Sequence, residues 1–155
     1  MHPELLIRAA ERNDVPEIVR MLADDDLGST REKAADPLPA SYYAAFEAID
    51  ADANNHILVA VLGERVVGTL QLTFTPSLSY QGGWRATVES VRADASMRSQ
   101  GIGTALMQRA IEMARAKGCV LMQLSTHKTR VNAHRFYERL GFTAGHVGMK
   151  LPLDH

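Results

Sequence analysis

Residues 88–106 of this 155-residue chain read VESVRADASMRSQGIGTAL, and this stretch decides the fold. A strand runs into a loop with glycines at positions 101 and 103, and a helix opens at once. Glycine lacks a Cβ, so a ligand can approach the main chain closely there. The first amides of a helix lack internal partners, and the helix dipole makes them partly positive, which suits a phosphate or pyrophosphate. Arg98 adds a full positive charge, and Thr104 adds a hydroxyl.

Two other phosphate-binding motifs fit this glycine spacing poorly. A dinucleotide fingerprint needs a third glycine, where this chain has Leu106. A phosphate loop of the nucleoside-triphosphatase type needs Lys and then Ser or Thr after its last glycine, but Gly103 is followed by Thr104 and Ala105. On spacing alone, a plain glycine turn before a helix remains the alternative to an anion site.

The rest of the chain reads as strands and helices on both sides of this stretch. Upstream, the pattern predicts a strand at 5–9, a helix at 15–22 capped by Asn13 or Asp14, a helix at 41–49, a hairpin of strands at 56–61 and 66–75, a loop at 76–83 and a strand at 84–93. Downstream, it predicts a helix ending at Gly118, a strand at 119–124, a helix ending at Gly141 and a last strand at 142–151. No repeat or long linker interrupts this order, so residues 1–155 are interpreted as a single domain.

Composition excludes several classes of protein. The hydrophobic fraction of 46% and the charged fraction of 23% are those of a globular domain, not of a disordered chain. Cys119 is the one cysteine and the six histidines show no metal-ligand spacing, so neither a disulfide nor a metal site is expected. A net charge of −1 argues against nucleic-acid binding, and no apolar run could cross a membrane. The acidic start, MHPELLIRAAERND, resembles no targeting peptide, so we expect a cytoplasmic protein.

The hexapeptide Arg98–Gly103, RSQGIG, resembles the R/Q-x-x-G-x-G/A signature of the GNAT acetyltransferase superfamily. Three other segments are similar to motifs of that family in the same order: Ile7–Ala10 (IRAA), Val66–Gly68 (VVG) and Phe136–Phe142 (FYERLGF). The resemblance implies an α/β (α+β) fold with a mixed, mainly antiparallel sheet of six to seven strands. About four helices would flank this sheet, and it would splay between strands 4 and 5. It also implies transfer of an acetyl group from acetyl-CoA to a primary amine by direct attack.

The resemblance also assigns the residues that hold the acetyl-CoA. The main chain of Val91, Arg92 and Ala93, at the end of the fourth strand, would bind the pantetheine arm. The pyrophosphate would be held by the following loop and helix start, Arg98, Ser99, Gln100, Gly101, Ile102, Gly103 and Thr104. Many members carry an Asn seven residues before a tyrosine of the last helix, but this chain has Arg130 there. Asn132 lies two residues further on and is the candidate replacement.

Two side chains are candidates for proton transfer. Tyr137 occupies the place of the family tyrosine that protonates the departing thiolate, although it also fits the apolar face of its helix as a core aromatic. Glu89 interrupts an otherwise uncharged stretch in a strand expected to be largely buried. A carboxylate there must be paired, hydrated or functional, so it is either the base that deprotonates the amine or a structural ion pair with Arg85 or Arg130.

The acceptor amine is not fixed by these motifs. Residues 1–75 carry 6 basic and 13 acidic residues, and residues 76–155 carry 11 and 5, which gives −7 and +6. An acidic half would suit a cationic small-molecule amine, with Asp36, Tyr42 and Tyr43 as candidate contacts. The alternative function is a non-catalytic acyl-CoA-binding sensor or interaction module of the same fold. A homodimer is the assembly expected on general grounds.

Overall fold

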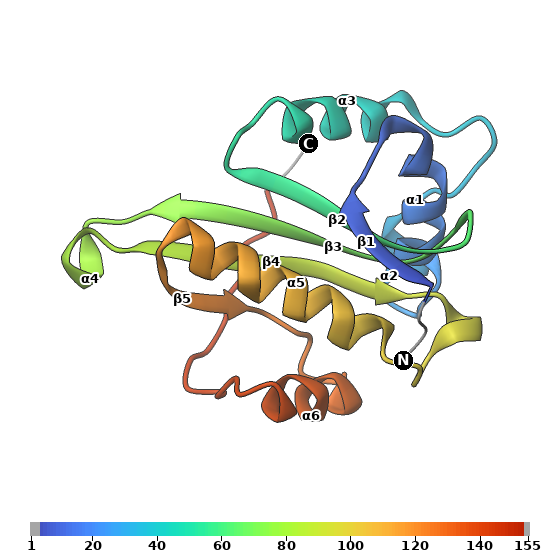
Figure 1. Ribbon diagram of the computed structural model, residues 1–155. Coiled ribbons are helices and arrows are strands. Elements are labelled where there is room, and N and C mark those ends of the chain that lie inside the picture. The colour runs from blue at the N-terminus through green and yellow to red at the C-terminus, as the bar shows by residue number, and fades with distance from the viewer. Residues whose placement is uncertain (1–3, 154–155) are drawn as a thin grey trace. The chain divides into compact units, whose positions relative to one another are not determined.

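The computed structural model describes residues 4–153, and the chain divides into two compact units, Met1–Gln123 and Leu124–His155. The first unit is built on a sheet with the strand order β1-β2-β3-β4-β5 (Figure 1). The strands are β1 (Leu5–Ala9), β2 (Asn55–Leu62), β3 (Arg65–Pro76), β4 (Trp84–Ala93) and β5 (Cys119–Leu124). Neighbours from β1 to β4 pair antiparallel, and β4 and β5 are parallel, so the sheet is mixed.

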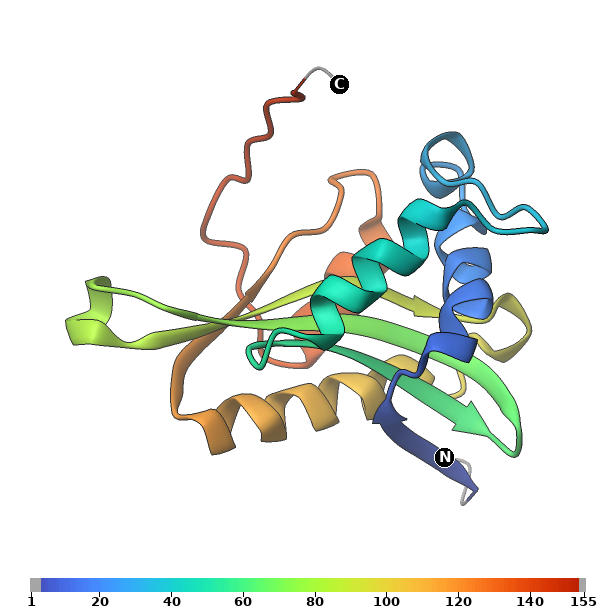
Figure 2. The same cartoon turned by 90° about the horizontal axis from the view of Figure 1, so that it is seen from above.

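The helices of the first unit lie on both faces of the sheet. Figure 2 shows α5 (Ile102–Lys117) beneath the sheet, and α1 (Val15–Ala23) and α3 (Ala40–Asp50) on the opposite side. The sequence of β3 explains why the two faces of the sheet differ. Side chains alternate between the faces of a strand, so every second residue belongs to the same face. Its even-numbered positions from 68 to 74 read Gly, Leu, Leu, Phe, and its odd-numbered positions from 69 to 75 read Thr, Gln, Thr, Thr.

The apolar face of β3 packs against α5. Leu70 and Leu72 of β3, and Ile102, Leu106 and Met107 of α5, are almost completely buried. Gly68 allows the close approach of the helix, since a Cβ at this position would lie 2.6 Å from Ile102 Cγ2 and 3.0 Å from Leu106 Cδ1. This contact fixes where the first turn of α5 meets the sheet.

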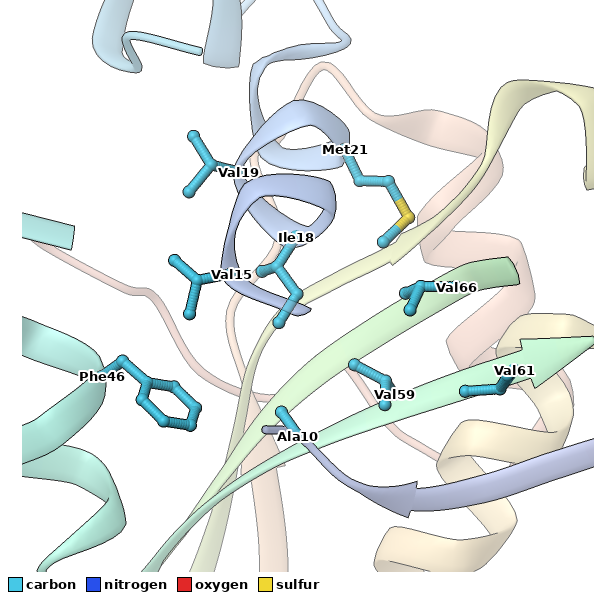
Figure 3. Close-up of a cluster of buried hydrophobic side chains, with 9 residues drawn as sticks. All are labelled: Ala10, Val15, Ile18, Val19, Met21, Phe46, Val59, Val61 and Val66. Atoms are coloured by element: carbon cyan, nitrogen blue, oxygen red, sulfur yellow. The ribbon is translucent and has the colours of Figure 1, made fainter. Parts of the chain in front are cut away.

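A second apolar cluster fills the space between α1, α3 and the other face of the sheet (Figure 3). Its members are Ala10, Val15, Ile18, Val19, Met21, Phe46, Val59, Val61 and Val66. Asp14 was predicted as a cap of α1, but its carboxylate makes no cap bond to that helix. It accepts instead from Arg8 Nη1 at 2.7 Å and from the Glu11 amide at 2.7 Å, so it ties β1 to the start of the helix.

Most elements lie where the sequence predicted them, and two short helices were not foreseen. The strands β4 and β5 match the predicted ranges residue for residue, and α5 ends before Gly118, which has a φ of 86°. The unforeseen helices are α2 (Gly28–Arg31) and α4 (Ser79–Gly82), each four residues long. No helix among residues 4–153 is long and apolar enough to span a membrane.

The predicted last strand, 142–151, is wrong. These residues have no strand structure, so the described chain has a five-stranded sheet in place of the six to seven strands expected. Val147, Met149 and Leu151 alternate with other residues as in a strand, yet they are 88%, 90% and 82% exposed. A strand is stable only beside a paired neighbour, and no described strand pairs with this segment. The second unit contains one helix, α6 (Val131–Arg139).

Candidate functional site

The turn between β4 and α5 is held at both ends and exposed in its middle. Met97 is 8% exposed and Ile102 is 1% exposed, so the hydrophobic core anchors the chain on either side. Residues 98–101, between these two anchors, are all exposed. Ser99 has a φ of 65° and Gly101 a φ of 83°, so two of the three consecutive residues 99–101 adopt the left-handed backbone conformation. The predicted glycine motif is therefore a fixed, outward-facing turn.

Gly101 is the N-cap residue of α5, and no side chain caps this helix in the part of the chain described. The Ala105 amide makes the first internal bond, to Gly101 O at 3.0 Å, which leaves the amides of Ile102, Gly103 and Thr104 ahead of it. A Cβ at Gly101 would meet no atom within 4 Å, so the space over the helix start is open. An uncapped start of a 16-residue helix, beside the exposed Arg98, is an environment that favours an anion.

Asp94 fixes the position of this turn and was not singled out in the sequence. It caps the 3-10 turn η2 (Ala95–Met97), accepting from the Ser96 amide at 3.0 Å and the Ser96 hydroxyl at 3.1 Å. Its other oxygen accepts from Arg65 Nη2 at 2.7 Å and Arg20 Nη2 at 3.0 Å. The Ser96 amide and hydroxyl and the two guanidinium groups lower the pKa of Asp94 to about 2, although burial opposes the shift.

A β-bulge interrupts β4 just before the turn. Gln71 of β3 pairs with Glu89 and Thr69 pairs with Arg92, so Ser90 and Val91 together oppose a single residue of β3. Ser90 has a φ of 55°, a strained value for a residue with a side chain. Bulges of this kind leave a residue outside the hydrogen-bond ladder and re-aim the main chain. The bulge therefore lies in the segment that was predicted to bind the pantetheine arm, Val91, Arg92 and Ala93.

The Arg92 side chain takes part in a contact that the sequence did not reveal. Its Nη1 donates to Val91 O at 2.9 Å, and its Nε lies 3.4 Å from Asp25 Oδ2. Asp25 follows α1, and it also accepts from the Gly28 amide at the start of α2. The guanidinium therefore ties the end of β4 to the chain between α1 and α2.

Glu89 is exposed, so the expectation that it lies in a buried part of the strand is wrong. The reason is its face: Glu89 pairs with Gln71, on the side of the sheet opposite α5, beyond the cluster that α1 and α3 cover. No ion pair with Arg85 is present in the described chain. A hydrated carboxylate at this position needs no structural partner, and a solute can reach it.

A row of uncharged polar side chains lies on this same face and was not foreseen. Its members come from β2, β3, β4 and β5, and they are Asn55, Gln71, Thr73, Thr87 and Gln123; we call them the polar row. Gln71 Nε2 and Thr73 Oγ1 donate to Asn55 Oδ1 at 3.0 and 3.2 Å, and Gln123 Nε2 donates to Thr87 Oγ1 at 3.2 Å. The alternation of Thr and Gln along β3 was a visible signal for it, but the partners depend on strand register.

Tyr137 and Asn132 belong to the second unit. Both lie on α6, where Asn132 is exposed and Tyr137 is half-buried. The Tyr137 ring lies edge-to-face against Phe136 at 5.1 Å and Phe142 at 5.9 Å between centroids, and the Phe142 amide donates to Tyr137 O. The motif FYERLGF thus folds as a helix end that holds the tyrosine ring between two phenylalanines.

The two tyrosines predicted as acceptor contacts make contacts within the chain. Tyr42 hydroxyl donates to Glu32 Oε1 at 2.9 Å and accepts from the Lys33 amide at 2.9 Å. The Arg12 guanidinium lies 4.3 Å from the centroid of the Tyr43 ring. Burial, followed by the contact with Glu32, raises the pKa of Tyr42, so its hydroxyl stays protonated at neutral pH. Through these contacts Tyr42 ties α3 to Glu32 and Lys33, and Tyr43 ties it to Arg12.

Two further kinds of reactive group in the described chain bear on a second site, the cysteine thiol and possible metal ligands. Burial raises the pKa of the half-buried Cys119 thiol, and Lys117 opposes the shift only partly, so the thiol is a poor nucleophile at neutral pH. Among residues 4–153, no three His, Cys, Asp or Glu side chains gather as ligands for a metal ion.

Comparison with known proteins identifies the family. The model of the acetyltransferase (GNAT) family matches residues 17–142, most of the chain. The chain belongs to the GNAT family. The matched range includes β4, the exposed turn and α5.

Three relatives of this GNAT chain differ in what their names describe. A crystal structure of a transcriptional regulator from Bacillus halodurans C-125 is 52% identical, covers 96% of this chain and 99% of its own, and superposes with a TM-score of 0.94. An aminoalkylphosphonate N-acetyltransferase from Salmonella typhimurium is 36% identical over 61% of each chain. A glucosamine 6-phosphate N-acetyltransferase from Trypanosoma brucei brucei is 35% identical over 57% of this chain and 58% of its own. The matches thus span about three fifths of the two curated enzymes.

Proposed function

We propose that this GNAT protein transfers the acetyl group of acetyl-CoA to the primary amine of a small molecule, by direct attack in a ternary complex. The observation that carries the proposal is the exposed, uncapped start of α5 directly after the bulged end of β4. This arrangement offers an anion site next to the end of a strand, whose main chain would bind an extended amide-containing arm. Acetyl-CoA has both parts, a diphosphate and a pantetheine arm.

The residues assigned to acetyl-CoA fit these two parts. The amides from Arg98 to Thr104 bind the diphosphate, and the Arg98 guanidinium adds its charge. The main chain of Val91, Arg92 and Ala93 binds the pantetheine amides as an added strand would, between β4 and a splayed β5. Asn132 supplies a further side-chain contact to the same arm. Asp94 keeps the turn in place through Arg20 and Arg65.

The reaction needs a neutral amine, a donor for the developing oxyanion and a proton for the leaving sulfur. Glu89 takes a proton from the ammonium, directly or through water, and the amine nitrogen then forms a bond to the thioester carbonyl carbon. The Val91 N–H, which the bulge re-aims, stabilises the oxyanion. When the carbon–sulfur bond breaks, the Tyr137 hydroxyl gives its proton to the thiolate, and the second proton of the amine nitrogen, which is cationic after attack, passes to the resulting phenolate through water. No nucleophile from the protein is involved, which agrees with the raised pKa of Cys119.

A small amine is supported as the acceptor by two observations. The two curated relatives are N-acetyltransferases of an aminoalkylphosphonate and of glucosamine 6-phosphate, both small amines. The 1–75 half of the chain carries an excess of 7 negative charges, which favours a cationic acceptor.

An amine panel with acetyl-CoA tests the proposal. The panel contains glucosamine, glucosamine 6-phosphate, an aminoalkylphosphonate, a polyamine and an acidic amino acid, and free thiol is followed with time. We expect thiol release with at least one amine and an equal amount of acetylated product by mass spectrometry. A preference for the acidic amino acid would contradict the cationic acceptor, and no release with any amine would contradict the enzyme.

The second candidate is a non-catalytic acetyl-CoA-binding regulator. It is favoured by the structure that is 52% identical, which is named a transcriptional regulator. This candidate uses the same acetyl-CoA site and predicts binding of acetyl-CoA without thiol release. The amine panel, run beside a calorimetric titration of acetyl-CoA, separates the two.

A further inference from the structure

The open sheet face beside Glu89 carries the polar row, and its members follow the strand register. Asn55 pairs with Thr73, and Thr73 pairs with Thr87, whose hydroxyl accepts from Gln123. The line therefore crosses four strands, a span of about 14 Å at the usual strand spacing of about 4.8 Å. On the next register line, Gln71 pairs with Glu89.

The hydrogen bonds of the polar row leave defined groups for a ligand. Asn55 Oδ1 accepts two bonds, from Gln71 and Thr73, so the Asn55 amide nitrogen keeps its own donors. Gln71 donates through Nε2, which leaves Oε1 as an acceptor, and the Thr87 hydroxyl accepts from Gln123 and can still donate. Among the described residues these atoms have no second partner. Donors and acceptors held in place by one another are pre-organised for recognition.

The row also ends in a cavity. A space of about 160 Å³ between α3 and the start of β2 is lined by Asn55, together with Asp50, Asp52, His56, Phe46 and Ile57. A ligand that lies along the row thus has room at its β2 end. The other end of the row is Gln123 on β5, whereas the exposed Glu89 lies on β4, beside the row on the Gln71 line.

We propose that the polar row is the acceptor platform and that it selects an amine bearing several hydroxyl groups. This inference rests on the proposed acetyl transfer and names the acceptor class of that site. The ammonium lies at Glu89, and the hydroxyl groups exchange hydrogen bonds with Gln71, Thr73 and Asn55. An alkylamine leaves those polar groups without partners in the complex, which costs binding energy.

The test compares glucosamine with cyclohexylamine, which has the same ring size without the hydroxyl groups. The readout is the ratio of the two kcat/KM values, measured by thiol release. Gln71→Met and Thr73→Val keep side-chain volume and remove hydrogen bonds, and Gln108→Met is the matched control because Gln108 is exposed on α5, on the other side of the sheet. Comparing each variant with the wild type by this ratio cancels the different basicities of the two amines.

We expect the wild type to prefer glucosamine, each row variant to lower that preference about tenfold, and Gln108→Met to leave it unchanged. A wild type without preference for glucosamine, or row variants that keep the wild-type ratio, would show that the face is merely solvated and overturn the platform. Two row variants guard against one failing to fold, and the melting temperature and acetyl-CoA affinity report folding. Absence of thiol release from every amine would instead contradict the proposed function itself.

Discussion

Arg65 Nη2 donates to Asp94 Oδ2 over 2.7 Å, and this contact ties the β2–β3 hairpin to the residue at which β4 gives way to the turn before α5. Arg20, from α1, donates to the same oxygen at 3.0 Å. Segments from three parts of the chain thus meet at one buried carboxylate, 5% exposed, that immediately precedes the exposed turn. The position of the turn, and of the amides behind it, depends on Asp94 staying ionised.

Acid should therefore destabilise the protein through Asp94. Its pKa of about 2 in the folded state is below its unfolded value near 3.9, so the folded state binds fewer protons between these limits. The stabilisation is complete above about pH 4 and is lost as the pH falls toward 2. Asp94→Asn should lower the free energy of unfolding at pH 7 by about 2 kcal/mol, and the difference from wild type should shrink below pH 4. Urea unfolding across this pH range measures it.

The control for Asp94 is Asp26→Asn, a change at an exposed carboxylate in the chain after α1. It should leave the free energy of unfolding within about 0.5 kcal/mol of the wild type. Because Asp94 positions the turn, its variant should also raise KM for acetyl-CoA more than it lowers kcat. A difference from wild type that stays constant from pH 7 to pH 2 would contradict the role of the ionised carboxylate.

Gly101→Ala tests the turn itself. With a φ of 83°, an L-residue at position 101 costs about 1–2 kcal/mol, and strain at this position disturbs the amides that open α5. Gly63→Ala is the matched control, since Gly63 has a φ of 65° in the β2–β3 turn and equally open surroundings. Both variants should lose similar stability in thermal unfolding. Only Gly101→Ala should weaken acetyl-CoA binding, by about tenfold, and equal affinity in the two variants would remove the turn from the binding site.

Tyr137→Phe tests the proton donor. Removing the hydroxyl keeps the ring between Phe136 and Phe142, so the fold should be retained. Loss of a general acid should lower kcat by about a hundredfold with little change in KM for acetyl-CoA. Tyr80→Phe, at a tyrosine that is 63% exposed, serves as the control and should leave kcat unchanged. An unaltered kcat in Tyr137→Phe would make this tyrosine a packing residue.

Glu89→Gln tests the base and has a distinctive pH signature. At neutral pH the acceptor is an ammonium ion, so loss of the carboxylate should lower kcat/KM at least tenfold. As the pH rises toward the pKa of the amine, the acceptor loses its proton to solvent and the variant should recover. Glu64→Gln, at an exposed position in the β2–β3 turn, should follow the wild-type profile. A defect in Glu89→Gln that is the same at every pH would favour a role in binding over proton transfer.

Local patterns were sufficient for the elements next to strong stop signals. Strand β5 was predicted residue for residue because Gly118 ends the helix before it. The end of α5 was predicted from the same glycine, and its start was placed only within the loop of the two glycines. The alternation of Val147, Met149 and Leu151 predicted a last strand that the structure does not contain. Such a pattern forms a strand only where a neighbouring strand supplies the hydrogen bonds. Sequence shows the alternation but not the neighbour.

The site was predicted where it is continuous in sequence and missed where it depends on tertiary contacts. The turn at 98–104 lies in one segment, whereas Asp94 acquires its role from Arg20 and Arg65, 74 and 29 residues away. Glu89 was expected to be buried because its strand is apolar, but whether a sheet face is covered depends on where the helices end. The partners in the polar row depend likewise on strand register, which pairs Thr73 with Asn55 on one side and with Thr87 on the other.

The most direct test of the anion site is a pair of calorimetric titrations in wild type and Gly101→Ala, with acetyl-CoA and with S-acetyl-pantetheine, which carries the same arm and thioester but neither the diphosphate nor the adenosine 3′-phosphate beyond it. If the amides at the start of α5 hold the diphosphate, acetyl-CoA should bind at least a hundredfold more tightly, and the difference should diminish in Gly101→Ala and at high salt. Equal affinity for the two ligands, or no heat on titrating acetyl-CoA, would contradict the account.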